Sequence, residues 1–202
     1  MTNPVIKSPL YREYVTLIDG AGDEIAIGSA GGLSADIATI AAGENVIGKV
    51  GFPDIVVTVT PTVDTSAYTS GDLLFRSVEI PSAVRANGGT CILQSVVLLD
   101  KAAQGVAMTL VFANANTPFG VPNSAPNPTD AGAATVLGHV AVATGDYVDL
   151  GGSKVAYITN LGVLMQADAS ATSLYVAGIN STGTPTYGAA SDLVFKFGFL
   201  RS

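Results

Sequence analysis

The chain has 202 residues but only one Cys, one His and no Trp. A single Cys excludes a disulfide within the chain. One Cys and one His together also exclude zinc fingers, iron–sulfur sites and most other transition-metal sites. The sequence is therefore poor in the side chains that perform chemistry, and we expect neither a bound cofactor nor a metal.

Charged residues are also scarce, at 12%, and acidic residues outnumber Lys and Arg by 16 to 9. A net charge of -7 argues against a nucleic-acid partner, which requires a basic surface. The long uncharged stretch 102–129 contains four Pro and four Asn residues, so it cannot form a membrane-spanning helix. The opening residues 1–7 lack the pattern of a secretory signal, and we expect synthesis in a host cytoplasm and no membrane partner.

From residue 55 onward, short runs rich in Val, Ile, Thr and Phe alternate with Gly, Pro, Asn and Asp. This texture predicts an all-β domain over 55–202, an antiparallel β-sandwich or a barrel. In the last run, Leu193, Phe195, Phe197 and Phe199 share one face and are expected to be core. The predicted strands begin at Ile55, Leu73, Thr90, Met108, Val136, Val155, Gly162, Ser173 and Leu193.

Residues 1–54 differ because they are rich in Gly and keep no regular hydrophobic period, apart from a possible short helix over 33–42. This composition predicts an extended N-terminal arm that becomes ordered against a partner. Lys7, Tyr11, Arg12 and Tyr14 are candidate partner-binding residues, because Arg and aromatic side chains carry much of the energy of interfaces. The same four residues are also compatible with an edge strand of the domain itself.

The remaining candidates for chemistry are His139 and Cys91, and both fit structural positions in strands. A catalytic Cys91–His139 pair and a convergent pair of carboxylates both stay open at this stage. No nucleotide-binding or hydrolase motif is present, and the Asp19–Glu24 segment lacks the ligand spacing of a calcium loop. We therefore expect a protein that is not an enzyme.

Five segments carry a family resemblance: 64–75, 85–101, 174–178, 183–187 and 193–200. Together they resemble virion proteins of tailed bacteriophages, and the match covers roughly residues 55–202. The group includes jelly-roll capsid decoration (cement) proteins and components of head or tail fibres. The resemblance implies an antiparallel β-sandwich of the jelly-roll type and a non-enzymatic structural role, often in a trimer.

Two functions are compatible with this resemblance. In the first, the protein decorates and stabilises the outer surface of a capsid as a homotrimer, with its arm and β-sandwich binding the major capsid protein. In the alternative, it is a head- or tail-fibre module that binds a host receptor through the Pro- and Asn-rich loop 114–132 and Tyr187. That loop is expected to be an ordered surface loop.

Overall fold

The computed structural model describes residues 54–201. Residues 1–53 of the predicted arm, including the helix over 33–42, lie outside the described residues. So do the four candidate partner-binding residues, Lys7, Tyr11, Arg12 and Tyr14.

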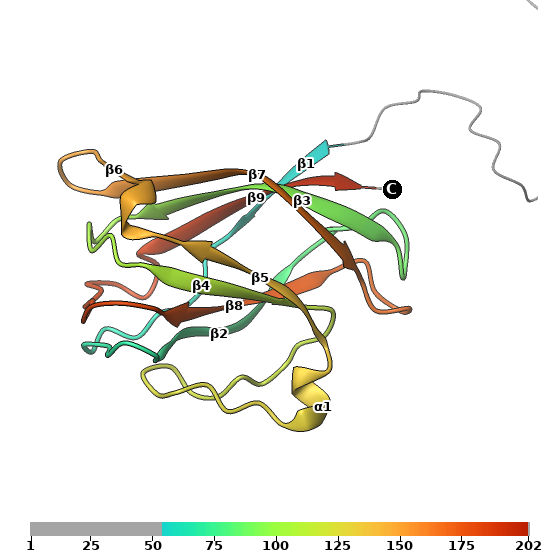
Figure 1. The fold of residues 1–202 in the computed structure, drawn as a ribbon, viewed down its shortest axis with the longest axis horizontal. Coiled ribbons are helices and arrows are strands. Elements are labelled where there is room, and N and C mark those ends of the chain that lie inside the picture. Colours follow the sequence, from blue (N-terminus) through green and yellow to red (C-terminus); the bar gives the residue numbers. More distant parts are fainter. Residues whose placement is uncertain (1–53, 202) are drawn as a thin grey trace, which may run out of the picture. The chain divides into compact units, whose positions relative to one another are not determined.

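The described chain forms two antiparallel sheets packed face to face (Figure 1). One sheet has five strands in the order β1-β9-β3-β7-β6, and the other has four in the order β2-β8-β4-β5. Its two helices are a single turn each, and neither is long and apolar enough to cross a membrane. The elements are β1 (Asp54–Val59), β2 (Leu73–Ile80), β3 (Thr90–Asp100), β4 (Met108–Ala113), α1 (Asp130–Ala133), β5 (Val136–Val142), η1 (Thr144–Asp146), β6 (Tyr147–Asp149), β7 (Lys154–Gln166), β8 (Leu174–Asn180) and β9 (Leu193–Arg201).

The strand pairing follows one rule, in which the first strand pairs with the last and each later pair nests inside. Thus β1 pairs with β9, β2 with β8, β3 with β7, and β4 with β5. A long antiparallel hairpin rolled up in this way is a jelly roll, so the predicted fold class is confirmed. The short strand β6 extends the edge of the five-stranded sheet beside β7.

The structure differs from the prediction in two strands. The sequence predicts separate strands beginning at Val155 and Gly162, whereas β7 is continuous. Asn160 and Gly162 have positive φ angles of 58° and 64° there, and the β3–β7 register shifts beside them. A bulge of this kind bends a strand without ending it, which explains why turn-forming residues occur inside β7.

The core lies between the two sheets and contains the inward face of β9. Leu193, Phe195, Phe197 and Phe199 are all buried, which confirms the predicted alternation. Phe195 and Phe197 stack at a ring-centroid distance of 5.8 Å. These rings fill the space that two facing sheets must close.

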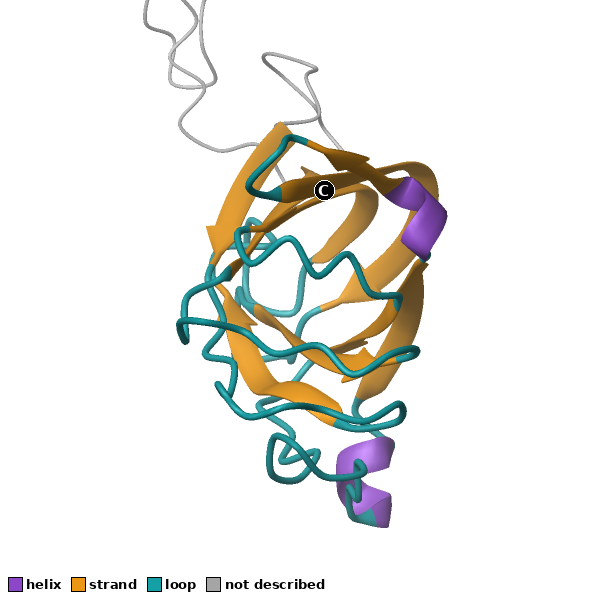
Figure 2. Ribbon diagram, turned by 90° about the vertical axis from the view of Figure 1, so that its left-hand side faces the viewer, coloured by secondary structure: helices purple, strands orange, loops and turns teal. Residues whose placement is uncertain are grey.

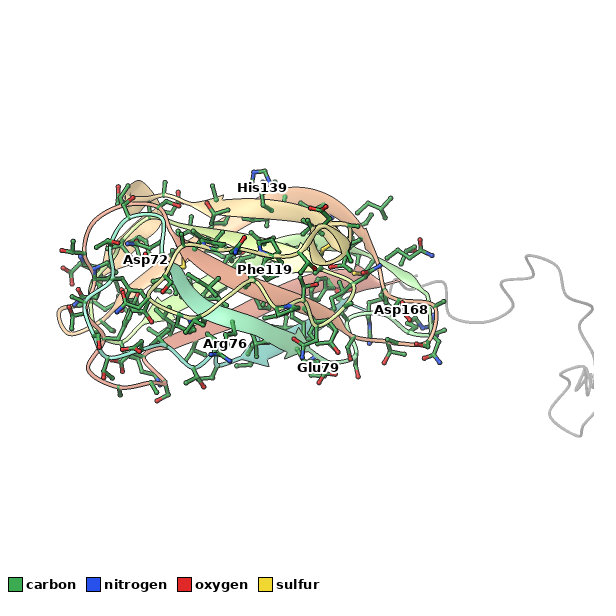
Figure 3. All side chains as sticks on the ribbon, turned by 90° about the horizontal axis from the view of Figure 1, so that it is seen from below. Asp72, Arg76, Glu79, Phe119, His139 and Asp168 are labelled. Atoms are coloured by element: carbon green, nitrogen blue, oxygen red, sulfur yellow. The ribbon has the colours of Figure 1, made fainter. Side chains whose placement is uncertain are left out.

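The long loop between β4 and β5 is ordered, as predicted, and covers the outer face of the four-stranded sheet. Phe119 is buried there against an outer cluster that includes Leu73, Ala113 and Ala177. The loop also pairs with the edge strand β2, because Asn123 N–H donates to the Leu73 carbonyl and Leu73 N–H donates to that of Ser124. Viewed from this side, Phe119 lies over the middle of the molecule (Figure 3).

Candidate interaction surface

The outer face of the five-stranded sheet is apolar. Side chains that point outward from this sheet alternate with the buried ones, and four of them are strongly exposed: Val56, Val148, Tyr157 and Leu164, at 60–67%. We call this surface the open face. It is defined by Val56, Ile92, Val97, Leu99, Val148, Val155, Tyr157, Leu164, Val194, Lys196 and Leu200.

Strand register arranges these side chains in rows across the sheet. One row runs Val194, Leu99, Val155 and Val148, and a second runs Leu200, Ile92 and Leu164. Two more rows lie between these. One runs Thr58, Lys196, Val97 and Tyr157, and the other, which is mainly polar, runs Val56, Gly198, Ser95 and Thr159. Neighbours in a row lie about 5 Å apart, so the apolar side chains form two bands, with Gly198, Ser95 and Thr159 between them.

The size of this patch indicates an interface. The four most exposed side chains present roughly 400 Å² of apolar surface, and the half-buried members add more. The largest apolar patch on a typical monomer is about 300–600 Å², and patches in this range often mark an interaction site. Acidic side chains are rare on it, since among residues 54–201 only Asp54 extends a row, at the corner beside Leu200.

The two outer faces of the sandwich are treated differently by the fold. The four-stranded sheet is covered by the β4–β5 loop through Phe119. In the described chain, no loop crosses the open face, which forms the upper surface in Figure 1. Within residues 54–201, the fold thus covers one outer face with its own loop and leaves the other uncovered.

A second surface feature lies where the β4–β5 loop meets the edge of β2. Three adjacent hollows of about 240, 280 and 340 Å³ share the exposed side chain of Arg76. Ser77 lines two of them, and its Oγ is buried without a hydrogen-bond partner. Figure 3 shows the molecule from below, and in that view Arg76 and His139 lie at opposite edges. The hollows could take a small polar ligand.

The structure does not bring the candidate catalytic residues together. Cys91 is 2% exposed in the core, and burial raises the pKa of its thiol to about 11, while the charge of Arg201 lowers it by less. A thiol with so high a pKa is not a nucleophile at neutral pH. His139 is exposed on β5, between Gly138 and the inward-pointing Val140. Both residues therefore have the structural positions that the sequence favours.

Tyr187 was expected at a receptor-binding surface, and that expectation is wrong. Its side chain is 1% exposed and packs edge-on against Tyr68, with ring centroids 6.0 Å apart. Its hydroxyl is buried without a hydrogen-bond partner, and burial raises its pKa. Tyr187 is thus a core residue in the β8–β9 loop.

Asp100, at the end of β3, is a buried carboxylate with a structural role. Its oxygens accept hydrogen bonds from the N–H groups of Ala102 (3.0 Å) and Gly105 (2.7 Å), which fixes the β3–β4 loop. Burial raises its pKa, and these backbone hydrogen bonds and the charge of Lys154 oppose that rise. The loops at this end of the sandwich are seen in Figure 2. Within residues 54–201, no group of three or more His, Cys, Asp or Glu side chains could hold a metal.

Sequence reasoning missed the open face, although a signal for it exists. The run Val96–Leu99 is apolar at four successive positions, and such a run is typical of a strand buried on both faces. In an antiparallel sandwich only one face of each strand meets the core. An apolar run on both faces therefore indicates that something else covers the outside.

Comparisons with known proteins identify no family. No protein-family model matches the chain, and no curated protein does. Among solved structures, a chain of the full particle of Israeli acute paralysis virus heated to 63 degrees is similar at 14% identity. The match covers 99% of this chain and 94% of that one, with a TM-score of 0.31. Function is therefore inferred below from the residues of this chain.

Proposed function

We propose that this chain is a non-enzymatic structural protein of a bacteriophage virion, which decorates and stabilises the outer surface of the capsid. The observation that carries the proposal is the open face, where Tyr157 and Leu164 stay 63% and 67% exposed on an otherwise well-packed domain. A surface of this kind gains free energy when a protein partner covers it, at about 25 cal/mol per Å² of apolar surface. An assembled particle offers such partners at high local concentration.

The chemistry of the described residues supports a structural role. The one thiol is buried, and the one imidazole is isolated from it on the surface. The buried carboxylate of Asp100 is already used by two backbone N–H groups. These groups explain the fold and form no convergent site for a reaction.

In this proposal, residues 1–54 contribute the contact with the major capsid protein. Lys7, Tyr11, Arg12 and Tyr14 combine positive charge with aromatic surface in the sequence, as interface anchors do. Ordering such a segment costs about 1–2 kcal/mol per residue, so its binding energy has to come from the capsid surface.

The test is binding of the full chain to expanded capsids of a phage that encodes it. We expect the protein to cosediment with these capsids and to raise their melting temperature. Replacing all four candidate anchors with Ala should abolish cosedimentation. The matched control is Arg85→Ala, which removes an exposed Arg from the turn between β2 and β3. Full binding by the quadruple variant would contradict the role of the anchors, and failure of the wild type to bind would contradict the decorating role.

The alternative, a fibre module that binds a host receptor, is favoured by one observation. The hollows around Arg76 are lined by Asn116, Thr117 and Pro118 of the β4–β5 loop, which is the loop expected to contact a receptor. A guanidinium beside hydroxyl and amide groups suits an acidic saccharide. Binding of the purified protein to host cells, lost in Arg76→Ala and retained in Arg85→Ala, would favour this function over decoration.

A further inference from the structure

One inner row of the open face, the row through Val97, contains one cation and one exposed aromatic ring on opposite sides of β3. Val97 on the central strand β3 pairs with Lys196 of β9 on one side and with Tyr157 of β7 on the other. Lys196 and Tyr157 are both exposed. They therefore lie one strand spacing, about 5 Å, to either side of the same residue.

We propose that the open face binds the open face of a second copy of this chain, about a two-fold axis that runs parallel to β3 above Val97. This operation exchanges the two sides of β3. Lys196 of one copy then lies over Tyr157 of the other, and the second Lys–Tyr pair forms by symmetry. Each ammonium group meets the face of a phenol ring, which is an attractive arrangement.

The outer rows fit the same axis. Val194 of one copy faces Val155 of the other across Leu99, and Leu200 faces Leu164 across Ile92. Sheets that pack face to face keep their strands within about 30° of each other, and this axis aligns them in that way. Apolar side chains therefore meet apolar side chains in both outer rows. In the inner row beside the Lys–Tyr pairs, Gly198 of one copy faces Thr159 of the other across Ser95.

Charge distinguishes this axis from a two-fold axis that also passes above Val97 but runs along the row, perpendicular to β3. That perpendicular axis would place Lys196 over Lys196 of the other copy. Two ammonium groups at such a contact repel each other, and like charges across an interface oppose pairing. The position of this one cation thus selects the axis parallel to β3.

The surface available suits a pair at the small end of specific interfaces. A face-to-face pair removes the open face of both copies from water, on the order of 1,000 Å² in total, close to the ~1,200 Å² at which specific interfaces begin. This inference rests on the proposed structural role, since it names the contact through which copies associate. It is tested without capsids, so a failure of either idea can be recognised separately.

The experiment measures association of the full chain by sedimentation equilibrium, with circular dichroism to verify that each variant is folded. We expect the wild type to form dimers. Tyr157→Lys places Lys opposite Lys196, and Lys196→Glu removes the cation from the ring, so each should weaken association about tenfold or more. The double variant Y157K/K196E places Lys opposite Glu in both pairs and should restore association to within about threefold of the wild type.

Two matched variants locate the contact. Leu164→Glu puts a charge in an apolar row and should weaken association about 100-fold or more. Val121→Glu is the control, because Val121 is 58% exposed, compared with 67% for Leu164, and lies on the β4–β5 loop. This change should have no effect on association. The predicted results for these five variants together would support the proposal.

Other outcomes would overturn it. If Y157K/K196E does not restore association, the axis parallel to β3 is excluded. The perpendicular axis would explain that failure, because it leaves like charges facing each other in the double variant. A trimer, which is the oligomer that the family resemblance implies, would exclude a two-fold pair. A monomer at millimolar concentration would exclude self-association, and protection of the open face from hydrogen exchange in that monomer would identify residues 1–53 of the same chain as the cover.

Discussion

Gly178 in β8 occupies a position where a methyl group has no room. A Cβ atom built there would lie 2.2 Å from Cε1 and 2.6 Å from Cζ of Phe75, which is fully buried in β2. Carbon atoms in contact are about 3.5–4.0 Å apart, so Gly178→Ala requires the ring to move by more than 1 Å. Phe75 cannot move freely, because its ring packs 5.5 Å from that of Phe195. We expect the free energy of unfolding to fall by about 2 kcal/mol, within the range for overpacked cores.

The assay is urea unfolding followed by circular dichroism, with Phe75→Leu as the partner of a double-mutant cycle. Since the smaller Leu leaves space for the new methyl group, the cost of Gly178→Ala should fall by at least about 1 kcal/mol in the Phe75→Leu background. Gly152→Ala is the control, because its Cβ would meet no atom within 4 Å. Additive costs in the cycle, or an unfolding free energy of Gly178→Ala within about 0.5 kcal/mol of the wild type, would refute the assigned packing.

Three further predictions concern single residues. Cys91 should resist a thiol reagent at pH 8 in the folded protein and react once the protein is unfolded, because burial raises its pKa to about 11; rapid reaction of the native protein would contradict this placement. Burial raises the pKa of Asp100, so its contribution to stability is greatest below the unfolded-state pKa of about 3.9 and is lost as pH rises through the folded-state pKa. The unfolding free energy of wild type minus that of Asp100→Asn should therefore decline as pH rises above about 4, and a difference that is flat or rises with pH would contradict the assignment. Phe119→Ala should release the β4–β5 loop and expose the outer cluster, which increased binding of an apolar dye would detect; unchanged binding would show that other contacts hold the loop.

The sequence was sufficient to predict the sandwich because its strands are punctuated by turn residues and its last strand alternates strictly. Leu193 and Phe195 point inward as predicted, because period-2 alternation reports directly on which face is buried. The short strand β6 was missed, since three residues are too few to show a period. β7 was divided in two, since a bulge and a turn use the same residues, here Asn160 and Gly162.

The candidate interaction surface was harder to predict than the fold. Tyr187 was placed at the surface because an aromatic residue in a loop is compatible with both contact and core, and only the packing against Tyr68 separates the two. The rows of the open face depend on the pairing of β3 with two strands that are distant in sequence, so Lys196 and Tyr157 gave no sign of being neighbours of Val97. Register of this kind is a tertiary property, which local composition does not contain.

The distribution of charge connects the open face with the net charge of -7. Long-range repulsion between acidic proteins opposes their association, so a surface that binds copies of the same chain has to keep carboxylates away from the contact. Asp64 and Asp168, both exposed, lie in loops, and both accept hydrogen bonds from backbone N–H groups nearby. Lys196 is the one cation in the rows of the open face described above. Asp64 and Asp168 thus carry their negative charge in loops, away from the sheet face through which we propose that copies associate.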